Sequence, residues 1–377
     1  MERSCDVFIE QAGNDVFAAV ARLLRPFSER VAGRRVLLKP NLHGGLGNTS
    51  PQVIAAVIRW ARAGGAAEVL LGEGPYYGLM DITAYIEDVG VAQVCRELDV
   101  PFVCFHSGKY RIVSPGCAAL PSQLGITEWF DWADLVISVP VMKTHFNTLT
   151  TLAFKNLKGF IRPQDKRALH SLDLHRAIAA LGTVIRPHIH VIDATVAYEG
   201  MGPSAGVPVD MGLLLASSDA FAIDVVANWL MGFEPPTVRY LLEAQSLGLG
   251  KLPADHEELG ALTNVPLADL QRWRRHFERP YQAWENKYPN LRISSERACS
   301  GCLMNLFTAL RDLEQEGLAS ALHGWIAIGK APTGADLVIG NCTFSAWDST
   351  DCVPGCPPLI AEIKAALRRI AKTPQGK

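Results

Sequence analysis

The sequence lacks a strong excess of charge of either sign, and it lacks an uninterrupted apolar run. Its 377 residues include 36 Lys and Arg against 38 Asp and Glu, a formal net charge of −2. A chain so balanced has no overall basic field to attract nucleic acid or an anionic membrane. Residues 211–233 form its most apolar long segment, but Asp219 and Asp224 interrupt it. We therefore expect no nucleic acid partner and no membrane span.

Several signatures of well-known enzyme classes are also missing. The sequence has no glycine-rich nucleotide fingerprint, no Walker loop, no serine-nucleophile elbow and no long repeat. Its first residues carry acids and do not form the apolar core of a signal peptide. Four cysteines are scattered singly through the first third, as is typical of buried thiols: Cys5, Cys95, Cys104 and Cys117. We expect a protein of the reducing cytoplasm.

Strand-like apolar runs alternate with helical patterns from residue 35 to about residue 230. The predicted strands are 36–38, 68–71, 102–105, 135–139, 189–192 and 213–216, and the predicted helices include 51–63, 82–97 and 219–230. This alternation is typical of a parallel sheet with helices between its strands. It predicts an α/β fold with a large, mostly parallel sheet domain in residues 1–250.

The rest of the chain changes character twice. In residues 251–296 aromatic side chains alternate with arginines. Such a mixture can bind single-stranded nucleic acid, but a helix that packs its aromatic stripe inward explains it more simply. We predict a helical connector there, followed by a smaller C-terminal α/β segment in residues 297–377.

Polar residues follow the predicted strands of the first domain repeatedly. In open α/β sheets, ligands bind beyond the carboxyl ends of the strands. The residues collected at these ends are Lys39, Asn41, His43, Glu73, Lys143, His145, Asp193 and Glu199.

A basic run between residues 143 and 175 marks the same region. Lysines, arginines and hydroxyl groups in a loop with glycine suit a carboxylate or phosphate, although a solvated basic face gives the same pattern. We predict that His145 is a proton donor or acceptor and that Lys143 and Lys155 act beside it on a small anionic substrate. The predicted anion-binding residues around them are Lys39, Asn41, Lys158, Arg162, Lys166 and His170.

Five of the nine cysteines lie in the last fifth of the chain: Cys299, Cys302, Cys342, Cys352 and Cys356. They fall in three predicted loops, after residue 297, after the strand 335–339 and before the helix 359–370. A cubane iron–sulfur cluster needs one thiolate for each iron, so this set predicts a [4Fe-4S] cluster. The alternatives are a zinc site and a set of inert thiols, but the later spacings form no second short knuckle typical of zinc.

The cysteine pattern resembles the proximal-cluster motif of nickel–iron hydrogenase small subunits and of the related complex I subunit. Both families have a cysteine pair, a cysteine after a strand and a Gly-Cys-Pro-Pro before a helix. The resemblance covers about sixty residues and implies that Cys299, Cys302, Cys342 and Cys356 are the ligands. Cys352 has no counterpart in the motif. Its flanks are typical of a turn, and it is a possible alternative ligand.

The first domain resembles the family known as domain of unknown function 362 (DUF362). The matching motifs are Lys39-Pro-Asn41, Gly72-Glu-Gly-Pro75, the stretch from Val139 to His145, the stretch from Leu152 to Gly159, and the stretch from Ile192-Asp-Ala194 through Gly202-Pro203. The resemblance covers about residues 30–250 and implies a shared fold and site, but no reaction.

These expectations combine into one function. We predict an iron–sulfur oxidoreductase or electron-transfer protein that acts on a small anionic substrate or on a redox partner protein. A lyase or isomerase that uses an open iron of the cluster as a Lewis acid is the first alternative. A carrier of electrons or clusters, without chemistry of its own, is the second.

Overall fold

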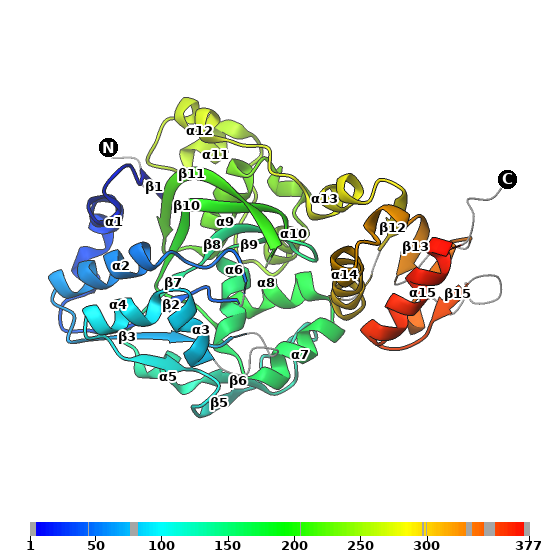
Figure 1. The fold of residues 1–377 in the computed structure, drawn as a ribbon. Coiled ribbons are helices and arrows are strands. Elements are labelled where there is room, and N and C mark those ends of the chain that lie inside the picture. Colours follow the sequence, from blue (N-terminus) through cyan, green and yellow to red (C-terminus); the bar gives the residue numbers. More distant parts are fainter. Residues whose placement is uncertain are drawn as a thin grey trace. The chain divides into compact units, whose positions relative to one another are not determined.

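The computed structural model describes residues 5–43, 45–75, 82–203, 205–295, 298, 300–328, 334–342 and 351–372 (Figure 1). The chain divides into two compact units, Met1–Pro280 and Tyr281–Lys377. The residues of the predicted connector, 251–296, are shared between these units.

The first unit is built on a sheet that has nine strands in the described part of the chain. Its main order is β1 (Phe8–Gln11), β11 (Ala205–Ser217), β10 (Ile189–Met201), β7 (Leu135–Val139), β2 (Arg35–Pro40), β3 (Glu68–Glu73) and β4 (Phe102–Cys104). The strands from β10 to β4 are parallel, while β11 runs antiparallel to both β10 and β1. The predicted α/β class with a mostly parallel sheet is confirmed.

Alternating side chains of the central strands enter two separate cores. Leu37 and Val136 contribute to one core, whereas Val36, Leu38 and Ile137 contribute to the other. Side chains alternate between the faces of a strand, so the two cores lie on opposite faces of the sheet. One core includes side chains of α1 (Val16–Leu24), α2 (Pro51–Ala63), α3 (Ile82–Asp88) and α4 (Val91–Glu97), and the other those of α6 (Ala153–Asn156), α8 (Leu174–Val184), α9 (Ala220–Leu230) and α10 (Arg239–Ser246).

Local signals in the sequence set several helix boundaries. Ser50 caps α2 by accepting a hydrogen bond from the Gln52 N–H, and Asp219 caps α9 through the N–H groups of Phe221 and Ala222. The predicted helix 82–97 is instead two helices, α3 and α4. Gly90 separates them with a φ of 75°, a left-handed conformation that favours glycine.

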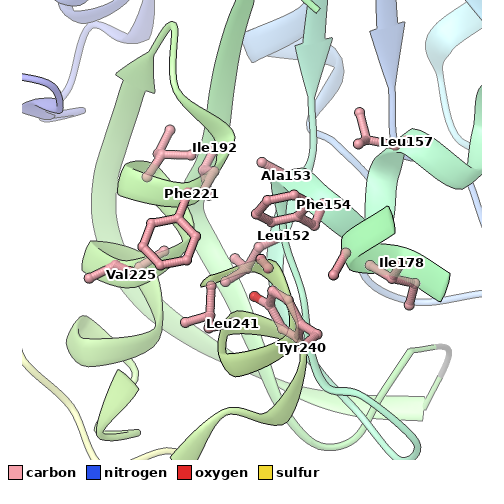
Figure 2. Packing of buried hydrophobic residues seen from close by; sticks show 14 of the residues in the cluster. Leu152, Ala153, Phe154, Leu157, Ile178, Ile192, Phe221, Val225, Tyr240 and Leu241 are labelled. Carbon is pink, nitrogen blue, oxygen red and sulfur yellow. The ribbon is translucent and has the colours of Figure 1, made fainter. Parts of the chain in front are cut away.

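The core around α6 fixes a short helix that carries functional residues. Figure 2 shows Leu152 and Phe154 of this segment among Ile178 of α8, Phe221 of α9 and Tyr240 of α10. Phe154 and Tyr240 meet edge to face, with ring centroids 6.1 Å apart. A helix this short has little stability of its own, so packing against its neighbours holds it in place.

Further elements flank the sheet of the first unit. Strands β8 (Val141–His145) and β9 (Leu149–Thr151) extend it beside β10, and β5 (Tyr110–Val113) pairs with β6 (Leu124–Thr127). The other described helices and turns of this unit are η1 (Arg25–Arg30), α5 (Glu128–Trp132), η2 (Leu157–Phe160), α7 (Pro163–Ser171), η3 (Pro235–Thr237), α11 (His256–Ala261) and α12 (Leu267–Trp273).

The second unit contains a parallel sheet in the order β12 (Leu291–Ser294), β13 (Gly324–Ile328), β14 (Leu337–Ile339) and β15 (Asp351–Val353). Its helices are α13 (Pro280–Lys287), α14 (Ser300–Gln315) and α15 (Ile360–Lys372), with the short turn η4 (Ala319–Ala321). The predicted strand and helix on either side of Cys342 and Cys356 are confirmed as β14 and α15. Within the described ranges of both units, every helix is too short or too polar to cross a membrane.

Candidate functional site

The lysines and histidines that the sequence singles out lie where the strands of the first unit end. Lys39 is in β2 and Glu73 ends β3, while Lys143 and His145 lie on β8, directly beyond β7. The remaining members come from the segment that follows β9: Lys155 on α6, Lys158 on η2, and Lys166 and His170 on α7. The parallel strands thus bring residues that are far apart in sequence to the same end of the sheet.

Lys39 makes an internal ion pair. Its Nζ lies 2.9 Å from Oε1 of Glu73, and it donates to the Asn156 Oδ1 at 2.8 Å and to the Pro40 carbonyl at 2.7 Å. Both charged side chains are almost fully buried. Gly159 covers this pair so closely that a Cβ there would overlap the Lys39 Cε. The three protons of the ammonium group are therefore used within the protein.

Lys166 and Arg162 also bind the chain itself. The Lys166 Nζ donates to the carbonyls of Gly74 at 2.6 Å and Pro75 at 2.9 Å, and it contacts the His106 Nε2 at 2.8 Å. Arg162 pairs with Asp165, with 2.6 Å between Nε and Oδ2. Like Lys39, these two predicted anion-binding residues organise the loops around the site.

Three lysines, Lys143, Lys155 and Lys158, make fewer hydrogen bonds to the protein than Lys39 and Lys166 do. The Lys143 Nζ donates to the Gly47 carbonyl at 2.7 Å, and this is its one hydrogen bond within the described residues. The Lys155 Nζ lies 2.9 Å from the His145 Nε2, and the Lys158 Nζ makes a short contact with the His170 Nε2. Lys143 is fully buried, whereas Lys155 and Lys158 are partly exposed. None of the three forms an ion pair within the described residues, so an added anion would displace no carboxylate from them.

Burial acts strongly on these amines. It lowers the pKa of Lys143 to about 7, and the charge of Lys155 adds to that effect. Burial also lowers the pKa of Lys155 to about 7. It moves the pKa of Lys158 well below the ordinary value, and the charges of Lys155 and Lys166 lower the pKa of Lys158 further. An anion placed among these amines would restore their charge, because an opposite charge favours the protonated form.

The histidines of the site are neutral near pH 7. Burial, and then the neighbouring lysine charges, move the pKa values of His43 and His145 well below the ordinary value and the pKa of His170 to about 2. The His145 Nδ1 accepts hydrogen bonds from the backbone N–H groups of Asn147 at 3.1 Å and Thr148 at 3.4 Å. His145 also stacks on Phe146, so its ring has a fixed orientation.

Two asparagines join the strands to α6. The Asn156 Oδ1 accepts from both Lys39 and the Asn41 Nδ2, and its own Nδ2 donates to the Ser138 Oγ at 2.9 Å. The Asn41 Oδ1 is buried and has no hydrogen-bond partner in the described part of the chain. It is therefore an available acceptor beside the lysines. Asn41 is one of the predicted anion-binding residues, but Asn156 was not predicted. The one signal for Asn156 in the sequence is its position directly after Lys155.

Three other carboxylates have structural roles. The Asp224 side chain accepts from the N–H groups of Ala153 and Phe154 at the start of α6. Asp193 and Glu199, which the sequence predicted at strand ends, lie within β10, because that strand continues past Ile192 to Met201. Asp193 accepts from the Ser50 N–H before α2, and Glu199 accepts from the Glu278 N–H. Nothing in the local sequence around Asp224 indicates its contact with the segment that carries Lys155.

The cysteine segments of the second unit also follow strand ends. Cys342 comes after β14, Cys356 after β15, and Cys302 lies in the first turn of α14, which follows β12. The Cys302 Sγ lies 3.0 Å from the point that a Cβ on Gly340 would occupy. The Asn341 N–H donates to the Gly355 carbonyl at 2.9 Å, and the Gly355 N–H donates to the Asn341 Oδ1 at 2.7 Å. Three cysteine-bearing segments therefore converge.

The described residues do not contain the whole predicted ligand set. Cys299 lies outside them, and they hold no group of three or more His, Cys, Asp or Glu arranged to bind a metal ion. Cys302 is buried, and Cys342 and Cys356 are exposed. The turn predicted around Cys352 is wrong: this residue lies in β15, opposite Val338, and packs on the small core that includes Ala327.

The solved structures that partly match this chain include two at low sequence identity. One is the lactate racemase apoprotein from Thermoanaerobacterium thermosaccharolyticum, at 13% identity and a TM-score of 0.44, over 60% of this chain and 57% of that one. The other is a protein from Thermotoga maritima, at 13% identity and a TM-score of 0.37, over 61% of this chain and 58% of that one. The chain thus spans less than two thirds of either structure.

Sequence comparisons give closer matches. A thylakoid-associated protein of Synechocystis sp. is 31% identical over 234 residues, which are 59% of this chain and 71% of that protein. The family model described as Domain of unknown function (DUF362) matches residues 36–228, the range that contains the lysines and histidines of the site. The chain belongs to the DUF362 family.

Proposed function

We propose that the protein is an iron–sulfur oxidoreductase that binds a small anionic substrate at Lys143, Lys155 and Lys158. The observation that carries the anion site is a group of amines with few carboxylates to neutralise them. Glu73 is paired with Lys39. Lys155 and Lys158 contact neutral histidines, and Lys143 donates to a backbone carbonyl. A carboxylate or phosphate supplies the missing negative charge and hydrogen-bond acceptors.

The same group of residues can move a proton. The His145 Nε2 lies 2.9 Å from the Lys155 Nζ, so a proton can pass between the imidazole and the amine. Burial lowers the pKa of Lys155 to about 7, which lies close to the pH at which a general acid or base is most effective. Lys158 and His170 form a second amine–imidazole pair.

The second unit supports a cluster on its cysteines. Parallel strands β12, β14 and β15 direct their carboxyl ends to one edge of the sheet, and the segments of Cys302, Cys342 and Cys356 begin there. Together with Cys299 they offer four thiolates, which fit a [4Fe-4S] cluster; a zinc ion is the alternative. A bound cluster would supply electron transfer, while the lysine–histidine site would bind the substrate and supply its protons.

Binding and iron analysis on the same preparations test this proposal. Anaerobically prepared protein should contain about four irons and four sulfides per chain. The variant Lys143→Ala should lose anion binding and turnover with a dye as electron donor, but it should keep its iron, because Lys143 is no cluster ligand. A colourless protein with one zinc and no acid-labile sulfide would contradict the cluster.

A second candidate is an isomerase or lyase without net electron transfer. The observation in its favour is that two amine–imidazole pairs, Lys155 with His145 and Lys158 with His170, can serve as separate proton-transfer groups. Such an enzyme would exchange a substrate C–H proton with solvent deuterium in the absence of any electron donor. Exchange that requires a reduced dye would support the oxidoreductase instead.

A further inference from the structure

The ring nitrogen of His145 that carries the proton determines whether Lys155 is an ammonium or an uncharged amine. The His145 Nδ1 accepts two backbone N–H groups, those of Asn147 and Thr148. A ring nitrogen that accepts hydrogen bonds carries no proton, so the neutral imidazole holds its proton on Nε2. Nε2 is therefore a donor.

The partner of that donor must have a lone pair. The Lys155 Nζ lies 2.9 Å from the His145 Nε2, and within the described residues it has no other hydrogen-bond partner. An ammonium group has three donors and no acceptor, so this contact requires Lys155 to be an uncharged amine.

The surroundings of Lys155 favour the same state. Among the described residues, the groups whose pKa values are shifted by Lys155 are all bases. They lie on the loop after β2 and on β8, η2, α7 and α8: His43, Lys143, His145, Lys158, His170 and His175. Glu73 interacts instead with Lys39, Lys143 and Lys166. The Lys155 residue is partly exposed.

We infer that Lys155 is a nucleophile that forms an imine with a small anionic carbonyl compound, of the class of 2-oxo acids. This inference rests on the proposed anion site, since Lys143 and Lys158 would hold the carboxylate. The Lys155 nitrogen forms a bond to the carbonyl carbon while the C=O π pair moves to oxygen. The oxygen then leaves as water with the two amine protons. The step involves no oxidation or reduction, and a covalent bond to the substrate follows from it.

Reductive trapping tests the inference. Glyoxylate, the smallest carbonyl carboxylate of this class, is added at pH 7 with cyanoborohydride, whose hydride reduces the imine to a stable secondary amine. Peptide mass spectrometry then gives the rate of labelling at each lysine. The exposed Lys109 and Lys251 serve as internal controls, because they lie on the surface and outside the lysine–histidine site. The variant Lys155→Arg cannot form an imine, so labelling at this position should disappear while Lys109 and Lys251 stay labelled.

The labelling rates decide the outcome. Lys155 should be labelled at least roughly tenfold faster than Lys109, because its contact with the His145 Nε2 holds it as an uncharged, nucleophilic amine. Its labelling rate should rise with pH through the region near 7 and then level off. Equal rates at Lys155 and Lys109 would overturn the inference.

A separate titration with oxalate, a dianion that cannot form an imine, distinguishes this inference from the proposed function. Oxalate binding without selective labelling of Lys155 would reject the imine and keep the anion site. Selective labelling without oxalate binding, and without protection by oxalate, would reject the anion site and keep the nucleophilic amine.

Discussion

The Asp224 Oδ1 accepts a hydrogen bond from the Ala153 N–H at 2.7 Å, although the two residues are 71 positions apart in the sequence. The other carboxylate oxygen, Oδ2, lies 3.1 Å from both the Phe154 nitrogen and the Tyr240 hydroxyl oxygen. One buried carboxyl group on α9 thereby caps α6, the helix that positions Lys155. The same carboxyl group therefore contacts both the core residue Tyr240 and the helix that carries Lys155.

The variant Asp224→Ala should destabilise the protein and misplace Lys155. It leaves two backbone N–H groups and a tyrosine hydroxyl without their acceptor in the core, which costs about 2–3 kcal/mol of unfolding free energy. Chemical denaturation measures that loss, and oxalate titration should show weaker binding. A variant that binds oxalate as wild type does would show that α6 needs no cap from Asp224.

The stability difference between wild type and Asp224→Asn should depend on pH. Burial raises the pKa of Asp224 to about 7. A carboxyl group with a raised pKa in the folded state stabilises the protein most below its unfolded pKa, and that contribution declines as pH rises toward 7. The advantage of wild type over the asparagine variant should therefore shrink between about pH 4 and pH 7. Thermal melts at several pH values measure it, and a constant difference would contradict the assignment.

The buried lysines should produce the opposite trend at higher pH. Burial lowers the pKa values of Lys143, Lys155 and Lys166 to about 7, against about 10.4 for an ordinary lysine. Because the unfolded chain binds more protons between these values, stability should rise from about pH 7 to about pH 10. The variant Lys143→Met should show a smaller rise in melting temperature. A melting temperature that falls over this range in wild type would exclude neutral buried amines.

Removing the carboxylate of the Lys39–Glu73 pair should be costly. The variant Glu73→Gln leaves a buried ammonium without its counter-charge, which lowers the unfolding free energy by about 3–5 kcal/mol. The matched control is Glu87→Gln, which breaks an exposed ion pair with Arg96 and should leave the melting temperature unchanged. Equal effects of the two substitutions would show that burial does not strengthen the Lys39–Glu73 interaction.

Substitution of single cysteines should separate the ligands from the strand residue. Cys352 is a residue of β15 and pairs with Val338 of the neighbouring strand β14. Cys356 lies beyond the end of β15, next to Gly355, which is hydrogen-bonded to Asn341. We therefore expect Cys352→Ser to keep full iron and sulfide and Cys356→Ser to lose the cluster or retain a three-iron form. Iron and sulfide assays on both variants check this. The reverse result would reject the ligand assignment.

The sequence predicted where residues lie better than it predicted what they contact. The end of a parallel strand is visible as an apolar run followed by a polar residue, so Lys39, Glu73 and Lys143 could be placed at one edge. The ion pair that removes Lys39 from the anion-binding set could not be predicted, because it depends on the packing of Gly159 and Asn156 across distant loops.

The missed residues show the same limit. Asp224 lies inside an apolar helix, where a carboxylate indicates a buried partner but does not identify it. Cys352 follows polar, turn-forming residues, and its strand became evident only from its pairing with β14. Long-range contacts of this kind have no local signal in a single sequence.

Proton uptake on anion binding tests the central claim most directly. Wild-type protein is titrated with oxalate near pH 7.5 in two buffers that differ in ionisation enthalpy, and the difference in binding heat gives the number of protons exchanged. If Lys143, Lys155 and Lys158 form an anion site of uncharged amines, oxalate binding must raise their pKa values and take up protons. Binding without proton uptake, or no binding at all, would contradict the account.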